Sequence, residues 1–254
     1  MIRVVLFDLG STLIYFAASW QEVIPRASLA LAENLIQHGL PLRRESFVAA
    51  FLRRIQEYYL QRESEFIEYT TLSVLRDLLA EQGYPAVEPF ALRRALDCFY
   101  AVSQAHWQVE DDAHPALQAL RRAGYRLGMI SNAGDALDVH ALIDNAALRD
   151  YFDLILISAE LGIRKPHPRI FRVALDHFQV NPRQAVMVGD TLGADVLGAN
   201  GVGMASIWIT RRAATPDNRD HLDTIQPSAV VATLAEIPAV LQGWSTSPSP
   251  DSTA

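Results

Sequence analysis

The stretch VVLFDLGSTLI, residues 4–14, decides the fold and points to the chemistry of this chain. It begins with four apolar residues that favour a β-strand, and such a continuous apolar run is typical of a strand buried on both faces. The run ends at the carboxylate of Asp8. The small residues Gly10, Ser11 and Thr12 follow, and they let a loop backbone approach a ligand closely. We therefore expect a buried first strand that presents an acid and a tight loop at its end.

Short β-rich segments recur along the chain, and each is followed by a helical pattern. Strands that alternate with helices predict a parallel sheet built from βαβ units. Segments such as AVMVG and DLILI are apolar almost throughout, as strands covered on both faces are. The sequence therefore predicts an α/β fold with a doubly wound parallel sheet. Its expected strands are residues 3–8, 125–131, 152–157, 184–190, 204–210 and 229–232.

Between residues 15 and 107 this alternation stops, and the apolar residues recur at helical spacing. Glycines and prolines at 39–41 and 83–85 separate the expected helices. The chain thus divides into an α/β core, residues 1–14 and 108–241, and a smaller all-helical cap, residues 15–107. Such a cap lies above the carboxyl ends of the strands, where open α/β sheets bind ligands. The Ser-, Thr- and Pro-rich end, residues 242–254, is expected to be a flexible tail.

The composition argues against several classes of protein. The chain of 254 residues carries a net charge of −7 and has no run of Lys or Arg that would bind a nucleic-acid backbone. Its one cysteine, Cys98, cannot form an internal disulfide, and no apolar stretch is long enough to span a membrane. We expect a cytoplasmic protein that binds neither nucleic acid nor membrane. Dimerisation through the cap is compatible with the sequence. Among the 22 basic residues, Lys165 is the one lysine.

Polar groups fall where the expected core strands end. Asp8 and Asp190 each end a strand, Ser131 and Asn132 end another, and Lys165 lies in the loop LGIRKPHP before a helix. Because the carboxyl ends of parallel strands share one edge of the sheet, these groups can converge although they are far apart in the sequence. An acid, a hydroxyl, an ammonium and a second acid would then line one crevice.

The motifs FDLGSTL, MISN, RKPHP and VGDTLGAD, in this order, resemble the four signature motifs of the haloacid dehalogenase-like (HAD) hydrolase superfamily. Each motif alone is weakly specific, whereas all of them in order at strand ends are highly specific. The resemblance covers residues 3 to about 210. It implies a Rossmann-like core, a helical cap inserted after the first motif, and a hydrolase of the phosphatase-like branch that acts on a small phosphorylated metabolite.

The resemblance and the chemistry of the groups together assign roles. Asp8 is expected to attack phosphorus and to form an aspartyl-phosphate that water hydrolyses. Lys165 is expected to neutralise charge on Asp8 and on the phosphoryl group. A carboxylate that faces a phosphate needs a hard cation, so Mg²⁺ is the expected cofactor. The expected metal ligands are Asp8, the carbonyl of Gly10, Asp190 and Asp195. The expected substrate-binding residues are Gly10, Ser11, Thr12, Ser131 and Asn132.

Gly10 departs from the family pattern. The family's phosphatases usually read D-x-D-G-T after the first strand, and the second acid protonates the leaving alcohol. Such general acid–base help is worth roughly 10²–10⁴-fold in rate. A phosphatase without it can use water or a cap residue for the proton, or can act on a phosphate whose leaving group needs little protonation.

Other functions are also compatible with a glycine at position 10. A 2-haloacid dehalogenase needs no such acid, but these enzymes usually carry an aromatic residue here and lack the acid pair of GDTLGAD. A phosphonate-cleaving relative uses a cap lysine, and the cap of this chain has none. A non-catalytic or vestigial protein that binds a phosphate ligand is a further reading, although a crowded charged cleft is costly to keep without an ion and a ligand. We therefore predict a Mg²⁺-dependent phosphohydrolase.

Overall fold

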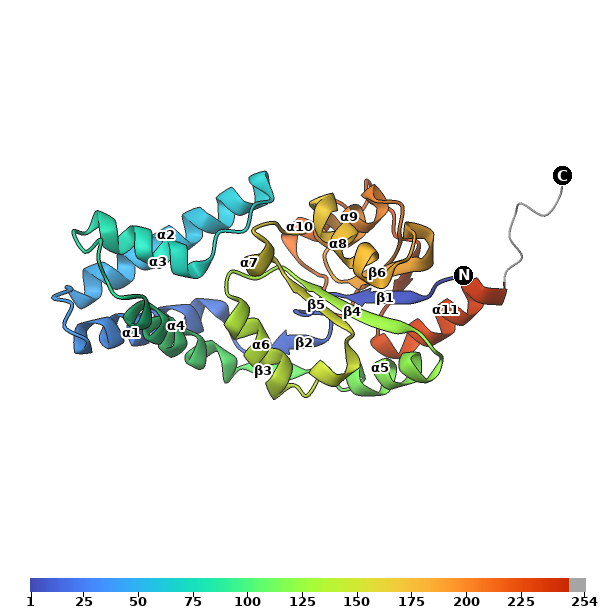
Figure 1. The fold of residues 1–254 in the computed structure, drawn as a ribbon, viewed down its shortest axis with the longest axis horizontal. Helices are drawn as coiled ribbons and strands as arrows, with labels where there is room; N and C mark the ends of the chain where they lie inside the picture. The colour runs from blue at the N-terminus through green and yellow to red at the C-terminus, as the bar shows by residue number, and fades with distance from the viewer. Residues whose placement is uncertain (247–254) are drawn as a thin grey trace.

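The computed structural model describes residues 1–246 and contains a parallel sheet with helices on both faces and a helical cap at one end (Figure 1). The strands lie in the order β5-β4-β1-β6-β7-β8, and all neighbours run parallel. This confirms the predicted α/β fold with its doubly wound sheet. The strands are β1 (Val4–Phe7), β4 (Arg126–Ser131), β5 (Leu154–Ile157), β6 (Ala185–Gly189), β7 (Ala205–Ile209) and β8 (Ala229–Val231).

The central strand β1 is anchored from both faces. Val5 and Phe7 pack into one apolar cluster with α5, α6 and α11, and Val4 and Leu6 pack into the opposite cluster with α8 and α9. All of these strand side chains are fully buried, and burial of each contributes about 1.5–3 kcal/mol. The residue that follows β1 therefore has a fixed place at the sheet edge. The helices are α5 (Ala113–Arg122), α6 (Ala136–Asn145), α8 (Pro168–Phe178), α9 (Leu197–Gly201) and α11 (Ile237–Thr246).

Short helical elements connect the longer ones. A π-helical turn, η3, follows β6 after two intervening residues and leads into α9. These short elements are α7 (Ser158–Leu161), α10 (Pro216–Arg219), η1 (Arg149–Tyr151), η2 (Pro182–Gln184), η3 (Leu192–Val196) and η4 (Leu234–Glu236).

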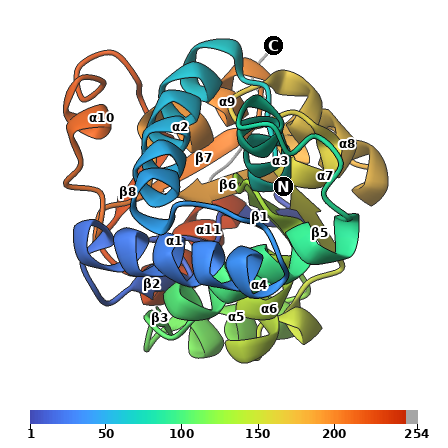
Figure 2. The same cartoon turned by 90° about the vertical axis from the view of Figure 1, so that its left-hand side faces the viewer.

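The cap has an apolar core of its own, built from helices α1 to α4. It extends from one end of the sheet, on the left of Figure 1, and Figure 2 views it from that side. The glycines at 39 and 83, predicted as helix breaks, have positive φ angles of 90° and 93° and follow α1 and α3. We keep residues 15–107 as the proposed extent of the cap. The helices are α1 (Trp20–Gln37), α2 (Arg44–Glu65), α3 (Thr71–Glu81) and α4 (Pro89–Gln104).

A small antiparallel ribbon connects the core to the cap. Strand β2 (Ile14–Phe16) leads into the cap, strand β3 (Trp107–Val109) leads out of it, and the two pair with each other. Sequence analysis does not predict this ribbon, because each strand has three residues and the pairing joins segments on opposite sides of the whole cap.

The C-terminal helix extends further than the sequence suggests. A flexible tail is expected from residue 242, whereas α11 continues to Thr246 because Trp244 packs against the core cluster. The rest of the expected tail, residues 247–254, lies outside the described residues. Within the described part of the chain, each helix is too short or too polar to cross a membrane.

The cap segment 66–71 binds the core through its backbone and through Glu68. The amide of Glu68 donates to the carbonyl of Gly162 at 3.1 Å, and the amide of Arg164 donates to the carbonyl of Phe66 at 3.2 Å. The carboxylate of Glu68 is buried, accepts a hydrogen bond from Ser158 Oγ at 2.7 Å, and faces Arg164 at 3.6 Å. The Tyr58 hydroxyl also donates to it. One buried cap carboxylate thus joins the cap to the start of α7 and to the loop that follows α7.

Glu68→Ala should lower the free energy of unfolding by about 3 kcal/mol, because it removes a buried acceptor that serves several polar groups. Urea denaturation at pH 7 measures the change. The matched control Glu33→Ala removes an exposed cap glutamate that lies 3.6 Å from Arg44, and it should change stability by less than about 1 kcal/mol. Equal small effects of both substitutions would contradict the role of Glu68 at this contact.

Candidate active site

Lys165 joins two carboxylates at the carboxyl edge of the sheet. Its Nζ donates hydrogen bonds of 2.6 Å to Oδ1 of Asp8 and of 2.6 Å to Oδ1 of Asp195. Asp8 follows β1, Asp195 lies in η3 after β6, and Lys165 lies between α7 and α8. All three are buried. Residues far apart in the sequence thus meet at one point, because parallel strands end at one edge of the sheet.

Burial and neighbouring charges shift the pKa values of Asp8, Asp190 and Lys165. Burial, opposed by the attraction of Lys165, raises the pKa of Asp8 to about 6. Burial also raises the pKa of Asp190 well above its usual range, and the charges of Asp8 and Asp195 add to the effect. For Lys165, burial favours the neutral form, but the attraction of Asp195 and Asp8 outweighs it and leaves the pKa raised. The lysine therefore stays charged at neutral pH, yet one ammonium does not balance the neighbouring carboxylates.

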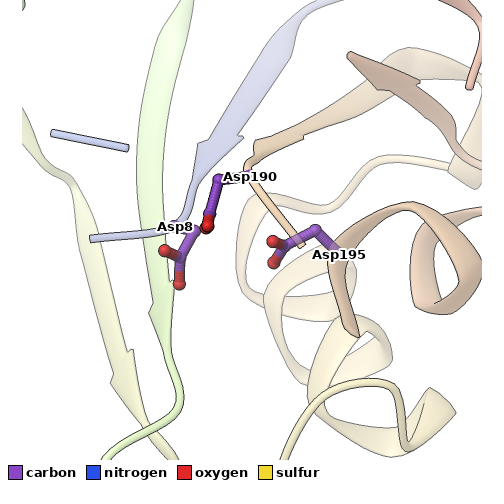
Figure 3. Close-up of side chains that lie close together, drawn as sticks. All are labelled: Asp8, Asp190 and Asp195. Carbon is purple, nitrogen blue, oxygen red and sulfur yellow. The ribbon is translucent and has the colours of Figure 1, made fainter. Parts of the chain in front are cut away.

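Asp8, Asp190 and Asp195 form an acidic cluster that fits a divalent cation. They offer carboxylate oxygens that lie within 4.8 Å of one another, and Figure 3 shows the three carboxylates gathered together. Both oxygens of Asp195 accept hydrogen bonds, from Lys165 and from the amide of Thr191 at 3.0 Å. Asp190 accepts a long hydrogen bond of 3.4 Å from the Thr191 hydroxyl. Hard oxygen donors with excess negative charge suit Mg²⁺, and Asp8 and Asp190 have the most open coordination.

Gly189 and Asn218 shape the turn that carries the second and third acids. A Cβ at Gly189 would lie 2.2 Å from the Asp195 carboxylate, so this carboxylate needs glycine there. The buried Asn218 side chain donates to the carbonyl of Asp190 at 2.8 Å and accepts from the amide of Leu192 at 2.7 Å. These contacts hold the π-helical turn, a rare element that often lies at functional sites. Sequence analysis misses Asn218, which is 28 residues from Asp190 and belongs to no motif.

Asn132 binds the backbone of Lys165 with both ends of its side-chain amide. Nδ2 donates to the Lys165 carbonyl at 2.9 Å, and Oδ1 accepts from the Lys165 amide at 2.8 Å. Both polar atoms are therefore engaged within the protein. Asn132 is expected from the sequence to bind substrate, but here it orients the loop that carries Lys165.

A cavity of about 340 Å³ opens onto these groups. Ser11 adopts a φ of 59°, in the left-handed region, and so turns the loop sharply beside Asp8. Thr12 is 1% exposed and does not line this cavity, and within the described residues its hydroxyl has no hydrogen-bond partner. The structure therefore does not bring Thr12 to the expected substrate site. The expected site residues that line the cavity are Asp8, Gly10, Ser11, Ser131, Asn132, Lys165, Asp190 and Asp195.

An indole ring covers Gly10. A Cβ at Gly10 would lie 3.6 Å from Cη2 of Trp107, which is ordinary van der Waals contact, and Gly10 does not have a positive φ in the left-handed region. Neither the backbone nor the first side-chain atom therefore demands glycine. A longer side chain at this position would extend toward the ring of Trp107, which comes from β3 at the cap junction.

A second cavity, of about 200 Å³, lies between the cap and the core and shares a wall with the first. Asp138 belongs to this shared wall. Burial, opposed by a hydrogen bond from Gln104 and helped by the charge of Asp135, raises the pKa of Asp138 to about 7. Sequence analysis misses Asp138, because an acid in the first turn of a helix looks like an ordinary partner of the helix dipole. It also misses Arg164, which lines the first cavity beside Lys165.

Comparison with known proteins agrees with this geometry. The family model for haloacid dehalogenase-like hydrolases matches residues 2–203. The chain is 32% identical to the glyceraldehyde 3-phosphate phosphatase of Pyrococcus abyssi over 208 residues, which cover 82% of this chain and 81% of that protein. It is 36% identical to the phosphoserine phosphatase of Thermus thermophilus over 138 residues, which cover 54% and 53% of the two chains.

A solved structure shares the whole architecture. The 2-haloacid dehalogenase from Pseudomonas syringae superposes with a TM-score of 0.67 at 28% identity, and the match covers 96% of this chain and 100% of that one. The family match spans most of the chain and includes the strand ends that carry Asp8, Lys165 and the acidic turn. The chain therefore belongs to the haloacid dehalogenase-like hydrolases.

Proposed function

We propose that this hydrolase is a Mg²⁺-dependent phosphatase that acts on a small phosphorylated metabolite through an aspartyl-phosphate on Asp8. The observation that carries the proposal is the ammonium of Lys165, which lies 2.6 Å from Asp8 and 2.6 Å from Asp195, beside the carboxylate of Asp190. A dehalogenase has no evident use for this acidic cluster. A charged, dianionic substrate, by contrast, requires balancing cations.

In the proposed mechanism, Asp8 attacks phosphorus with a carboxylate oxygen, and the bond between phosphorus and the ester oxygen breaks. Lys165 stays charged and offsets the negative charge that spreads over the phosphoryl oxygens in the transition state. Water then attacks phosphorus, the bond to Asp8 breaks, and inorganic phosphate leaves. Asn132 contributes by holding the backbone of Lys165 in place.

Asp8, Asp190, Asp195 and the carbonyl of Gly10 are the groups that would hold Mg²⁺. When bound, this cation would neutralise the excess carboxylate charge and would allow a phosphate dianion to approach Asp8. Ser11 and Ser131, which both line the cavity, are proposed to hold the phosphoryl oxygens with nearby backbone amides.

The cavity volumes and the names of two relatives both support a small substrate. The first cavity is about 340 Å³ and the adjoining one about 200 Å³, which is enough for a phosphoryl group and a small organic remainder. Two relatives are named for glyceraldehyde 3-phosphate and phosphoserine. We therefore place the substrate among small phosphate monoesters.

The central test is a screen of phosphate monoesters, acyl phosphates and 2-haloacids with Mg²⁺ or with a chelator. Phosphate release should require the metal and should fall by about 10⁴-fold or more in Asp8→Asn, because the substitution removes the nucleophile. The control is Asp223→Asn, which replaces an exposed acid and should leave the rate unchanged. Halide release in the presence of chelator would instead identify a dehalogenase. Absence of any turnover would contradict the proposed activity and would favour a non-catalytic protein.

Lys165→Arg should lower kcat by about 10²–10³-fold while the protein stays folded, because a planar guanidinium cannot replace a compact ammonium between two carboxylates. Steady-state kinetics measure the effect, and circular dichroism checks the fold. A folded variant with kcat within threefold of the wild type would show that any buried cation suffices at this position.

Mg²⁺ should stabilise the fold more at pH 7.5 than at pH 5. The raised pKa values of Asp8 and Asp190 mean that protons occupy these carboxyl groups at low pH and compete with the metal. At about 100 times the Kd, the expected gain is about 2.7 kcal/mol, read as a rise in Tm. Asp190→Asn should abolish this rise, whereas Asp217→Asn, at an exposed acid of the same cavity, should keep it. An equal rise in Asp190→Asn would place the metal elsewhere.

A further inference from the structure

A phosphate ester of an alcohol needs a proton donor, because an alkoxide is a poor leaving group. Gly10 has no side chain to supply one. In the part of the chain that the structure describes, no histidine lines either cavity. The acids of the cluster are paired with Lys165 or assigned to the metal. The donor must therefore be sought among the other titratable groups that line the two cavities.

Most of these other groups are unsuitable. Burial raises the pKa values of Tyr59 and Tyr100, which weakens them further as acids. Asp135 is fully engaged, since Oδ2 accepts from Arg93 at 2.7 Å and Oδ1 accepts from two backbone amides of α6. Asp217 is exposed and, of the two cavities, lines only the first, so it does not lie in their shared wall.

Asp138 is differently placed. It lies in the first turn of α6 and in the wall that the two cavities share. Its Oδ1 accepts a hydrogen bond of 2.8 Å from Nε2 of Gln104, the last residue of α4. Within the described residues, its Oδ2 has no hydrogen-bond partner. One oxygen is thus held by the cap, and the other is available to a molecule in the cavities.

The shared wall is where an ester oxygen would lie. A substrate with its phosphoryl group against Asp8 and its organic remainder in the cap-side cavity spans the boundary between the two. In this placement the bond that breaks would lie at the boundary, beside the shared wall, which contains Asp138 and Trp107. The indole of Trp107 covers the direction in which a side chain at Gly10 would extend, so the donor has to come from another part of the wall.

We propose that Asp138 is a catalytic residue of this hydrolase, which gives a proton to the leaving alcohol and later takes one from the attacking water. The inference rests on the proposed phosphatase function. In the first step, an oxygen of Asp8 bonds to phosphorus, the ester bond breaks, and the Asp138 proton passes to the ester oxygen. In the second step, the Asp138 carboxylate takes a proton from water, which bonds to phosphorus as the bond to Asp8 breaks.

The charge environment supports this role. The pKa of Asp138, about 7, leaves a substantial share of the neutral acid at physiological pH, and the group can act as donor and then as acceptor. Arg93 from α4 and Asp135, which caps the N-terminus of α6, act on its pKa in opposite directions, and Gln104 favours the carboxylate. Tyr59 and Arg62 from α2 and Tyr100 from α4 also line the cap-side cavity.

Asp138→Asn tests the inference with two substrates whose need for a proton differs. Glyceraldehyde 3-phosphate releases an alkoxide, whereas 2,4-dinitrophenyl phosphate releases a phenolate that leaves without a proton. The substitution should lower kcat/KM for the alkyl ester by about 10²-fold or more and should change that for the activated ester by less than threefold. Asp144→Asn, at an exposed acid of the same helix that pairs with Arg149, is the matched control and should affect neither.

The pH profile of the wild type provides a second measurement that needs no variant. Because the donor must be protonated, kcat/KM for the alkyl ester should fall as the pH rises through about 7, while the activated ester should not show this fall. This result would support Asp138 even if Asp138→Asn failed to fold.

The outcomes separate the inference from the function on which it rests. Equal losses on both substrates, unchanged rates on both, or identical pH profiles would overturn the role of Asp138 and leave the phosphatase intact. A wild type that hydrolyses the activated ester alone would also overturn it, because no proton is then supplied. A wild type that hydrolyses neither ester would overturn the proposed function and this inference with it.

Discussion

The buried ammonium of Lys165, held between Asp8 and Asp195, is the interaction on which the site depends. Three charges taken out of water would be costly if any one of them were displaced, so their positions have to be fixed by the surrounding fold. Asp8 is fixed by a central strand whose side chains are packed on both faces. Asp195 can lie where it does because Gly189 has no side chain to displace its carboxylate. Lys165 is held in place by the side-chain amide of Asn132, which binds its backbone.

This arrangement leaves a charge imbalance that has chemical consequences. One ammonium faces the carboxylates of Asp8, Asp190 and Asp195, and burial prevents water from screening the excess. The raised pKa values of Asp8 and Asp190 express the same imbalance, since burial and the neighbouring carboxylates both disfavour their charged forms. A bound divalent cation would remove the imbalance without protonating Asp8, as the proposed attack by its carboxylate requires. The excess negative charge of the site is therefore the feature that the proposed chemistry would use.

The parts of the site that could be predicted from the sequence are those that follow from strand order, together with Lys165 and Asp195, which lie in the signature motifs. Asp8, Ser131 and Asp190 stand at strand ends, and parallel strands end at one edge, so their meeting needs no side-chain detail. Asn218, Trp107 and Asp138 could not be predicted, because each reaches the site through contacts between distant segments. The ribbon of β2 and β3 was missed for the same reason. Thr12 does not line the cavity, because a motif gives the residue type of a loop position but not the direction of its side chain.

The cap and the loops that carry Asn132 and Lys165 are not independent units. Glu68 of the cap binds Ser158, and the hydroxyl of Ser158 in turn accepts the amide of Ala133 at 2.8 Å, next to Asn132, which clamps Lys165. The backbone of the cap segment 66–71 also pairs with the residues that immediately precede Lys165. Moving this segment away from the core would break contacts with both loops at once. The position of the cap and the alignment of Lys165 therefore depend on the same hydrogen bonds, which ties the cap-side wall of the cavity to the geometry that the proposed chemistry needs.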